Sequence, residues 1–224
     1  MAELFLVRHG QASLGSQNYD CLSDTGKRQS IWLGEHFALN GLKFDRVVTG
    51  SLLRHAQTLD AIRLATPGIN VEWEIHPGLD EYDFHALFRA LRDEDLRLVE
   101  SAKRSPREFF KALRAVLHLW CEGALDDRVP ETWRAFQQRV AVARTAIQQS
   151  DARRVLVVTS GGVIGAFMQQ ILQAPTAMAI ELNMQIRNSS VTHCFFNHET
   201  IHLSSFDGIA HLDDPQRHAF QTYG

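Results

Sequence analysis

The chain has 224 residues, of which 45% are hydrophobic and 22% are charged, and its formal net charge is −3. This length and apolar content suffice for one large core, or for one core with an inserted cap. The mildly acidic balance gives no indication of a nucleic-acid partner or an anionic membrane surface. No apolar run approaches the roughly 20 residues that cross a bilayer.

The expected location of the protein is the cytoplasm. The sequence runs from Met1 directly into a strand pattern, which leaves no room for a signal peptide. Its three cysteines are widely spaced and odd in number, which is typical of neither a disulfide framework nor a zinc cluster. They are Cys21, Cys121 and Cys194.

Short β-rich segments alternate with longer helical patterns along the chain, which predicts an α/β fold. The first four β-rich runs are almost continuously apolar and suit a mostly parallel central sheet with helices on both faces. A final pair of runs, separated by a short turn, predicts an antiparallel edge. The expected strands are 4–7, 46–49, 71–75, 154–159, 191–196 and 200–206.

Three helices are expected between these strands. The first begins at the capping sequence Ser23-Asp24-Thr25 and continues toward Gly41. The second runs from Ser51, the expected cap, to about residue 64. The third runs from Gly161 to about residue 173.

Strand signals vanish between about residues 82 and 150. Two amphipathic helices are predicted there, one after Ser105-Pro106 and one after Pro130-Glu131. Their aromatic stripes are typical of core packing. We therefore expect a single domain spanning 1–224, with a helical cap insertion at about 82–150 over the C-terminal end of the strands.

The tripeptide Arg8-His9-Gly10 follows the first apolar strand. Ligands of open α/β sheets bind at the carboxyl ends of the strands. A histidine at this place can attack a phosphoryl group through a ring nitrogen, while the planar guanidinium of an arginine holds the phosphoryl oxygens. The tripeptide therefore predicts a phosphate-binding site.

Further groups suited to phosphate follow later strands. Arg54 falls in the first turn of a helix, where free N–H groups and the helix dipole favour an anion. Ser160-Gly161-Gly162 lies between a strand and a helix, so its backbone N–H groups can cradle a phosphate. Taken alone, Arg54 is more readily interpreted as a solvated helix residue.

Three carboxylates follow the third strand, in the segment 79–84. Transfer of a phosphoryl group to histidine needs an acid that protonates the departing oxygen. In isolation the segment is more readily interpreted as a solvated acidic loop. The carboxylates are Asp80, Glu81 and Asp83.

The order and spacing of these motifs resemble those of the histidine phosphatase superfamily, the phosphoglycerate mutase-like proteins. The resemblance covers nearly the whole chain, in segments 6–13, 22–29, 51–58, 79–84, 188–192 and 210–212. It implies a metal-independent phosphomonoester hydrolase that needs no cofactor and acts on a small phosphorylated substrate. It does not identify the substrate or the oligomeric state.

The resemblance also implies roles for individual residues. His9 would be the nucleophile and become phosphohistidine, and Arg8 and Arg54 would hold the non-bridging oxygens. Glu81 would donate a proton to the leaving group and then act as the base for water. Further candidates are Asn18, Ser160 and Gly161 as phosphate contacts, and Asp80 and Asp83 as alternative acids.

One position departs from the pattern. The family normally carries a second histidine immediately before the paired glycines, where this chain has Ser160. Loss of a charge-assisted donor is expected to cost roughly 1.5–3 kcal/mol of transition-state stabilisation, or about ten- to a few hundred-fold in rate. His55 and His85 are the two histidines that can compensate if their rings reach the pocket.

The leading hypothesis is therefore a phosphatase of reduced activity. A catalytically silent phosphate-binding or interaction module is the alternative that Ser160 suggests. A phosphoglycerate-type mutase is favoured less, because no basic cluster for a phosphorylated sugar acid is recognisable in the sequence.

Overall fold

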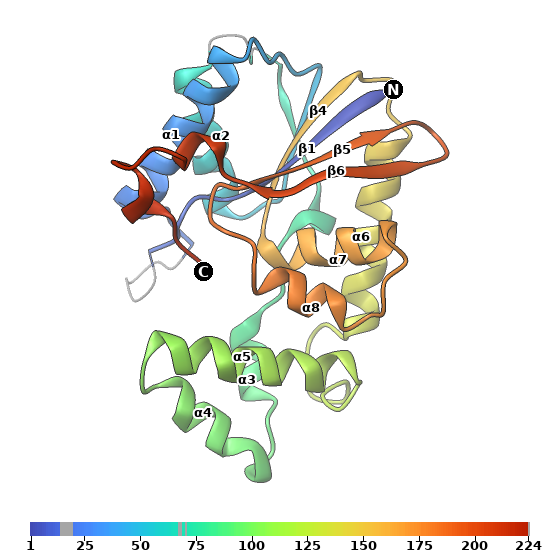
Figure 1. Ribbon diagram of the computed structural model, residues 1–224. Coiled ribbons are helices and arrows are strands. Elements are labelled where there is room, and N and C mark those ends of the chain that lie inside the picture. Colours follow the sequence, from blue (N-terminus) through green and yellow to red (C-terminus); the bar gives the residue numbers. More distant parts are fainter. Residues whose placement is uncertain (14–19, 67–68, 70, 224) are drawn as a thin grey trace.

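The computed structural model describes residues 1–13, 20–66, 69 and 71–223. Its centre is a six-stranded sheet in which the first four strands of the order are mutually parallel (Figure 1). β5 pairs antiparallel with β1, and β6 pairs antiparallel with β5. The predicted mostly parallel sheet with an antiparallel edge is confirmed. The order is β3 (Trp73–Ile75), β2 (Arg46–Thr49), β4 (Arg154–Thr159), β1 (Ala2–Arg8), β5 (Val191–Phe196) and β6 (Ile201–Gly208).

Both faces of the sheet are buried under helices, which explains the continuous apolar strands. In β1, Leu4 and Leu6 belong to one hydrophobic core, whereas Phe5 and Val7 belong to the other. The first core is completed by α6 (Trp133–Gln148) and α7 (Gly161–Ile171), and the second by α1 (Asp24–Leu39) and α2 (Leu53–Ala65). Successive side chains of a strand point to opposite faces, so a strand covered twice must be apolar throughout.

Side-chain caps set the starts of most long helices. Ser23 accepts the N–H of Gly26 at the start of α1, and Ser105 caps α5 (Pro106–Cys121) in the same way. The predicted cap of α2 is wrong. The helix begins after Leu52, and the Ser51 hydroxyl donates instead to Asp80. The N–H groups of Leu53 and Arg54 are satisfied by the Asp20 carboxylate, a distant group that replaces a local cap.

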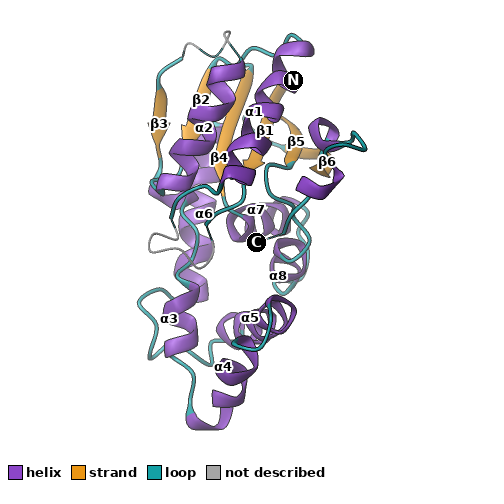
Figure 2. Ribbon diagram, turned by 90° about the vertical axis from the view of Figure 1, so that its left-hand side faces the viewer, coloured by secondary structure: helices purple, strands orange, loops and turns teal. Residues whose placement is uncertain are grey.

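A helical lobe lies beyond the carboxyl ends of the parallel strands (Figures 1 and 2). It contains α3 (Phe84–Arg89), α4 (Leu96–Ala102) and α5, and α8 (Met178–Asn183) lies between α7 and α5. α6, the second predicted helix of the insertion, packs along the sheet beside α7. Most of each aromatic stripe forms core, as predicted: Trp120 and Phe136 are fully buried. Phe109 and Phe110 differ, because they are half-buried and line the cavity described below.

Short elements account for most of the remaining differences from the predicted pattern. α3, α4 and α8 have six or seven residues each, too short for a helical period to stand out. Single 3₁₀ turns lie at Pro77–Leu79, Asp93–Asp95, Ala210–Leu212 and His218–Phe220. Within the described part of the chain, no helix has both the length and the apolar character of a membrane span.

Candidate active site

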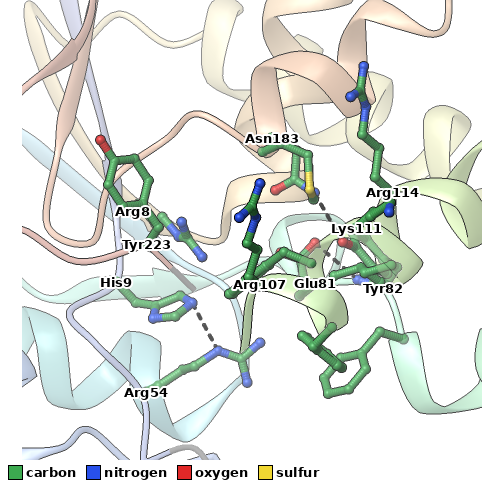
Figure 3. A pocket seen from close by; sticks show the side chains of 15 residues that line it. Arg8, His9, Arg54, Glu81, Tyr82, Arg107, Lys111, Arg114, Asn183 and Tyr223 are labelled. Carbon is green, nitrogen blue, oxygen red and sulfur yellow. Dashed lines mark hydrogen bonds between the residues drawn. The ribbon is translucent and has the colours of Figure 1, made fainter. Parts of the chain in front are cut away.

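A cavity of about 470 Å³ opens between the carboxyl end of the sheet and α5. Arg8 and His9 enter it from the end of β1, Arg54 from the first turn of α2, and Glu81 from the segment after β3. Figure 3 shows Arg8, His9 and Arg54 on one side and Glu81 with Tyr82 on the other. The fold thus brings together the four residues that the sequence predicted as catalytic.

Hydrogen bonds define the state of the His9 ring. Its Nδ1 lies 2.7 Å from the carbonyl oxygen of Gly10, which can only accept, so Nδ1 carries the proton. Nε2 accepts from Nε of Arg54 at 3.2 Å. Burial lowers the pKa of His9 well below its usual value, and the charges of Arg54 and Arg8 lower it further. The ring is therefore neutral, and its one in-plane lone pair, on Nε2, accepts from Arg54 in this structure.

The two arginines are held in different ways. Arg8 is buried and donates through Nη1 to the carbonyl of Ile186. Arg54 is also buried, and its Nη1 pairs with Asp20 Oδ1 at 2.8 Å. Asp20 thus orients the guanidinium that contacts the nucleophile. Sequence reasoning missed Asp20 because no local signal links it to a partner 34 positions away.

The three acidic candidates separate clearly. Glu81 lines the cavity, where Oε2 accepts the N–H of Gly162 at 3.0 Å, and burial raises the pKa of its carboxyl group. Asp80 is engaged by the backbone N–H and hydroxyl of Ser51, at 2.5 and 2.6 Å. Asp83 caps α3. Of the three, Glu81 is the carboxyl group that lies at the cavity and is biased toward its protonated form.

Ser160 is fully buried at the end of β4, with Oγ 2.7 Å from Nε2 of His55. Gly161 packs against Arg8: a Cβ there would lie 3.4 Å from the guanidinium carbon. Among the described residues, neither belongs to the cavity lining, so their phosphate contacts remain predictions. The same holds for Asn18, which lies outside the described residues.

The two histidines named as possible substitutes have different surroundings. His55 is buried, and its ring centroid lies 5.7 Å from that of His9. His85 is exposed on α3, and its ring centroid lies 4.0 Å from that of Phe84. Of these two histidines, His55 is therefore the one that lies beside the nucleophile.

The outer wall of the cavity comes largely from the helical lobe, and sequence reasoning did not identify it. Arg107, Lys111 and Arg114 of α5 lie three or four residues apart and share the face that lines the cavity (Figure 3). Arg114 pairs with Glu181 at 2.7 Å. Aromatic and aliphatic side chains fill the rest: Phe84, Phe109, Phe110, Leu113, Met184 and Tyr223.

Solved structures of similar fold include phosphatases and a mutase. Phosphoglycerate mutase from Bacillus anthracis matches with a TM-score of 0.67 and 18% identity, covering 94% of each chain. Phosphoserine phosphatase from Entamoeba histolytica, in complex with phosphoserine, matches with a TM-score of 0.67 and 18% identity, covering 95% of this chain and 100% of the other. A putative alpha-ribazole-5'-P phosphatase from Escherichia coli gives 0.65 and 24%, covering 93% and 97%.

Sequence comparison adds a short local match and a family. The mitochondrial serine/threonine-protein phosphatase PGAM5 of Rattus norvegicus is 37% identical over 68 residues, which is 30% of this chain and 24% of that protein. The match thus spans about a quarter of the relative's length. The family model described as histidine phosphatase superfamily (branch 1) matches residues 4–207. The chain belongs to the histidine phosphatase superfamily.

Proposed function

We propose that this protein is a metal-independent phosphomonoester hydrolase that works through a phosphohistidine at His9. The observation that carries the proposal is the neutral His9 ring, with its proton on Nδ1 and its Nε2 lone pair beside Arg54. A neutral imidazole nitrogen at the wall of a cavity that also holds two guanidinium groups is suited to attack a phosphate ester.

The first step transfers the phosphoryl group to the protein. The non-bridging oxygens of the phosphate take over the Nε–H of Arg54, which frees the Nε2 lone pair of His9. Nε2 then attacks phosphorus while the bond to the ester oxygen breaks, and Arg8 and Arg54 stabilise the non-bridging oxygens. Glu81 gives its proton to the departing oxygen, so the alcohol leaves neutral. The raised pKa of Glu81 favours this role, because a larger fraction of its carboxyl groups is protonated near neutral pH.

The second step releases phosphate. The Glu81 carboxylate removes a proton from a water molecule, and the resulting oxygen attacks phosphorus as the bond to Nε2 breaks. Inorganic phosphate leaves, Glu81 is protonated again and His9 returns to its neutral form. With Ser160 where the family resemblance implies a histidine, we propose a rate below that of a phosphatase with two histidines.

Substrates are proposed to be small phosphorylated molecules, as the names of the structural neighbours suggest. The outer wall of the cavity contains both apolar rings and the cationic side chains of Arg107 and Lys111. This combination favours an organic group that has an apolar body and a second negative charge.

The test is hydrolysis of 4-nitrophenyl phosphate by the purified protein in the presence of a metal chelator. Wild type should turn over and His9→Ala should not. Wild type quenched in alkali should carry a phosphoryl group that intact-mass measurement detects and that His9→Ala lacks. Activity that persists in His9→Ala would refute the phosphohistidine route.

A silent phosphate-binding module is the second candidate. The observation that favours it is the Ser160 hydroxyl, which is bonded to His55 and buried away from the cavity lining of the described residues. Binding of a phosphate ester without turnover or phosphohistidine would support this alternative, and turnover that depends on His9 would exclude it.

A further inference from the structure

His55 and Ser160 form a buried pair close to the nucleophile. Both side chains are fully buried, and Oγ of Ser160 lies 2.7 Å from Nε2 of His55. Ser160 is the N-cap residue of α7, where a serine side chain normally accepts a helix N–H, yet it makes no capping bond. Its hydroxyl is committed to His55 instead.

Gly50 makes room for the His55 ring. A Cβ on residue 50 would lie 2.4 Å from Nδ1 of His55, a separation that side chains do not tolerate. The ring therefore lies between Gly50 at the end of β2 and Ser160 at the end of β4. Three separate segments, β2, α2 and β4, meet around this one imidazole.

The pair is connected to the catalytic groups in two ways. The His55 ring lies 5.7 Å from the His9 ring, within the range of aromatic contact. Its neighbour in the chain, Arg54, donates to Nε2 of His9. Burial, together with the charge of Arg54, lowers the pKa of His55 to about 3, so the ring is neutral and adds no charge beside His9.

We propose that His55 is a positioning residue of the active site. Its hydrogen bond to Ser160 anchors the first turn of α2 to the end of β4 and so holds the Arg54 guanidinium against His9. The inference rests on the proposed function, because phosphoryl transfer at His9 is its readout. Ser160 then has a role that a comparison of motifs alone does not indicate: it is the anchor of a histidine from another helix.

The experiment separates the hydrogen bond from the space that the ring fills. His55→Phe keeps a ring but loses the bond, His55→Gln keeps an amide that can make it, and Ser160→Ala removes the partner. We expect kcat to fall about tenfold in His55→Phe and in Ser160→Ala, and no further in the double variant. His55→Gln should recover a clear part of the loss.

A control and a second readout complete the design. His193→Phe changes another largely buried histidine, on β5 beside Glu3, and should leave kcat unchanged. Thermal unfolding of every variant identifies any loss that is due to folding. Intact-mass measurement follows the phosphorylation of His9 by phosphoramidate. In each variant the rate of this phosphorylation should fall in parallel with kcat.

Three results would overturn the inference while wild type remains active: wild-type kcat in His55→Phe, additive losses in the double variant, or His55→Gln no better than His55→Phe. A wild type that neither turns over nor accepts a phosphoryl group from phosphoramidate would instead overturn the proposed function, and this inference with it. The two failures are thus distinguishable.

Discussion

Replacing Ser160 by histidine restores the residue that the family resemblance implies, and a higher rate is the simple expectation. The structure changes this expectation, because the ring of His55 already lies 2.7 Å from the Ser160 hydroxyl and both side chains are fully buried. A second imidazole has no room there, and overpacking of this kind costs about 1–3 kcal/mol of stability. We therefore expect Ser160→His alone to be destabilised and no faster than wild type.

Removing the obstructing ring at the same time should reverse the outcome. In Ser160→His combined with His55→Ala, the new imidazole gains the volume that His55 leaves. If it then donates to the phosphoryl group, about 1.5–3 kcal/mol of transition-state stabilisation returns, which corresponds to a kcat about ten- to a few hundred-fold higher than that of His55→Ala.

Steady-state hydrolysis of 4-nitrophenyl phosphate and thermal unfolding measure the two effects separately. His55→Ala alone is the matched control, because it creates the space without the new donor. Wild-type stability and a raised rate in Ser160→His alone would refute the steric reasoning. A double variant no faster than His55→Ala would refute the idea that a donor at position 160 reaches the transferring group.

Three further predictions concern the acid, the buried histidines and the cavity wall. Glu81→Gln should lower kcat by about 10²–10⁴-fold, whereas Asp80→Asn should change it only a few-fold; the reverse order in a kinetic comparison would assign the acid to Asp80. His55 and His211 both have a pKa lowered to about 3 by burial. Because the unfolded histidines bind protons below about pH 6.5, the free energy of unfolding should fall as the pH drops from 6.5 toward 3, by about 2 kcal/mol per histidine at pH 5. Urea unfolding at pH 7.5 and pH 5 measures this loss, and equal stability at both values would contradict it. Arg107→Ala should raise KM for 4-carboxyphenyl phosphate about three- to fivefold and leave KM for phenyl phosphate unchanged; an equal change for both would remove Arg107 from substrate selection.

The strands were predictable because the chemistry that defines them is local. β2, β4 and β5 have the predicted bounds. In β2 and β4, burial on both faces requires unbroken apolar runs, whereas burial alternates along β5. β3 is shorter than expected: its residues are exposed at the edge of the sheet, so no buried face fixes its length. The placement of Arg8, His9 and Arg54 at one cavity follows from the same rule, because the carboxyl ends of neighbouring parallel strands meet at one edge.

Contacts between distant segments were not predictable from local patterns. Asp20 replaces Ser51 at the start of α2 and pairs with Arg54, although the spacing around Ser51 is that of an ordinary cap. The local pattern does not distinguish Glu81 from Asp80 and Asp83, and only the family resemblance favoured it. In the fold, Asp80 accepts the Ser51 N–H and Asp83 caps α3. Asp20 and Asp80 are each paired with a residue that is distant in the sequence. No periodicity in the sequence between the two partners predicts the pairing.

The environment of Ser160 is the clearest example of this limit. From the sequence alone, serine at this position implies that a hydrogen-bond donor to the transferring phosphoryl group has been lost. In the fold, however, Ser160 is bonded to His55, and the ring of His55 fits only because residue 50 has no Cβ. These residues lie 105 and 5 positions from His55 and each is unremarkable alone, yet none can change without disturbing the others. Gly50, His55 and Ser160 therefore act together. The effect of Ser160 on kcat must be measured in variants that also change His55 or Gly50.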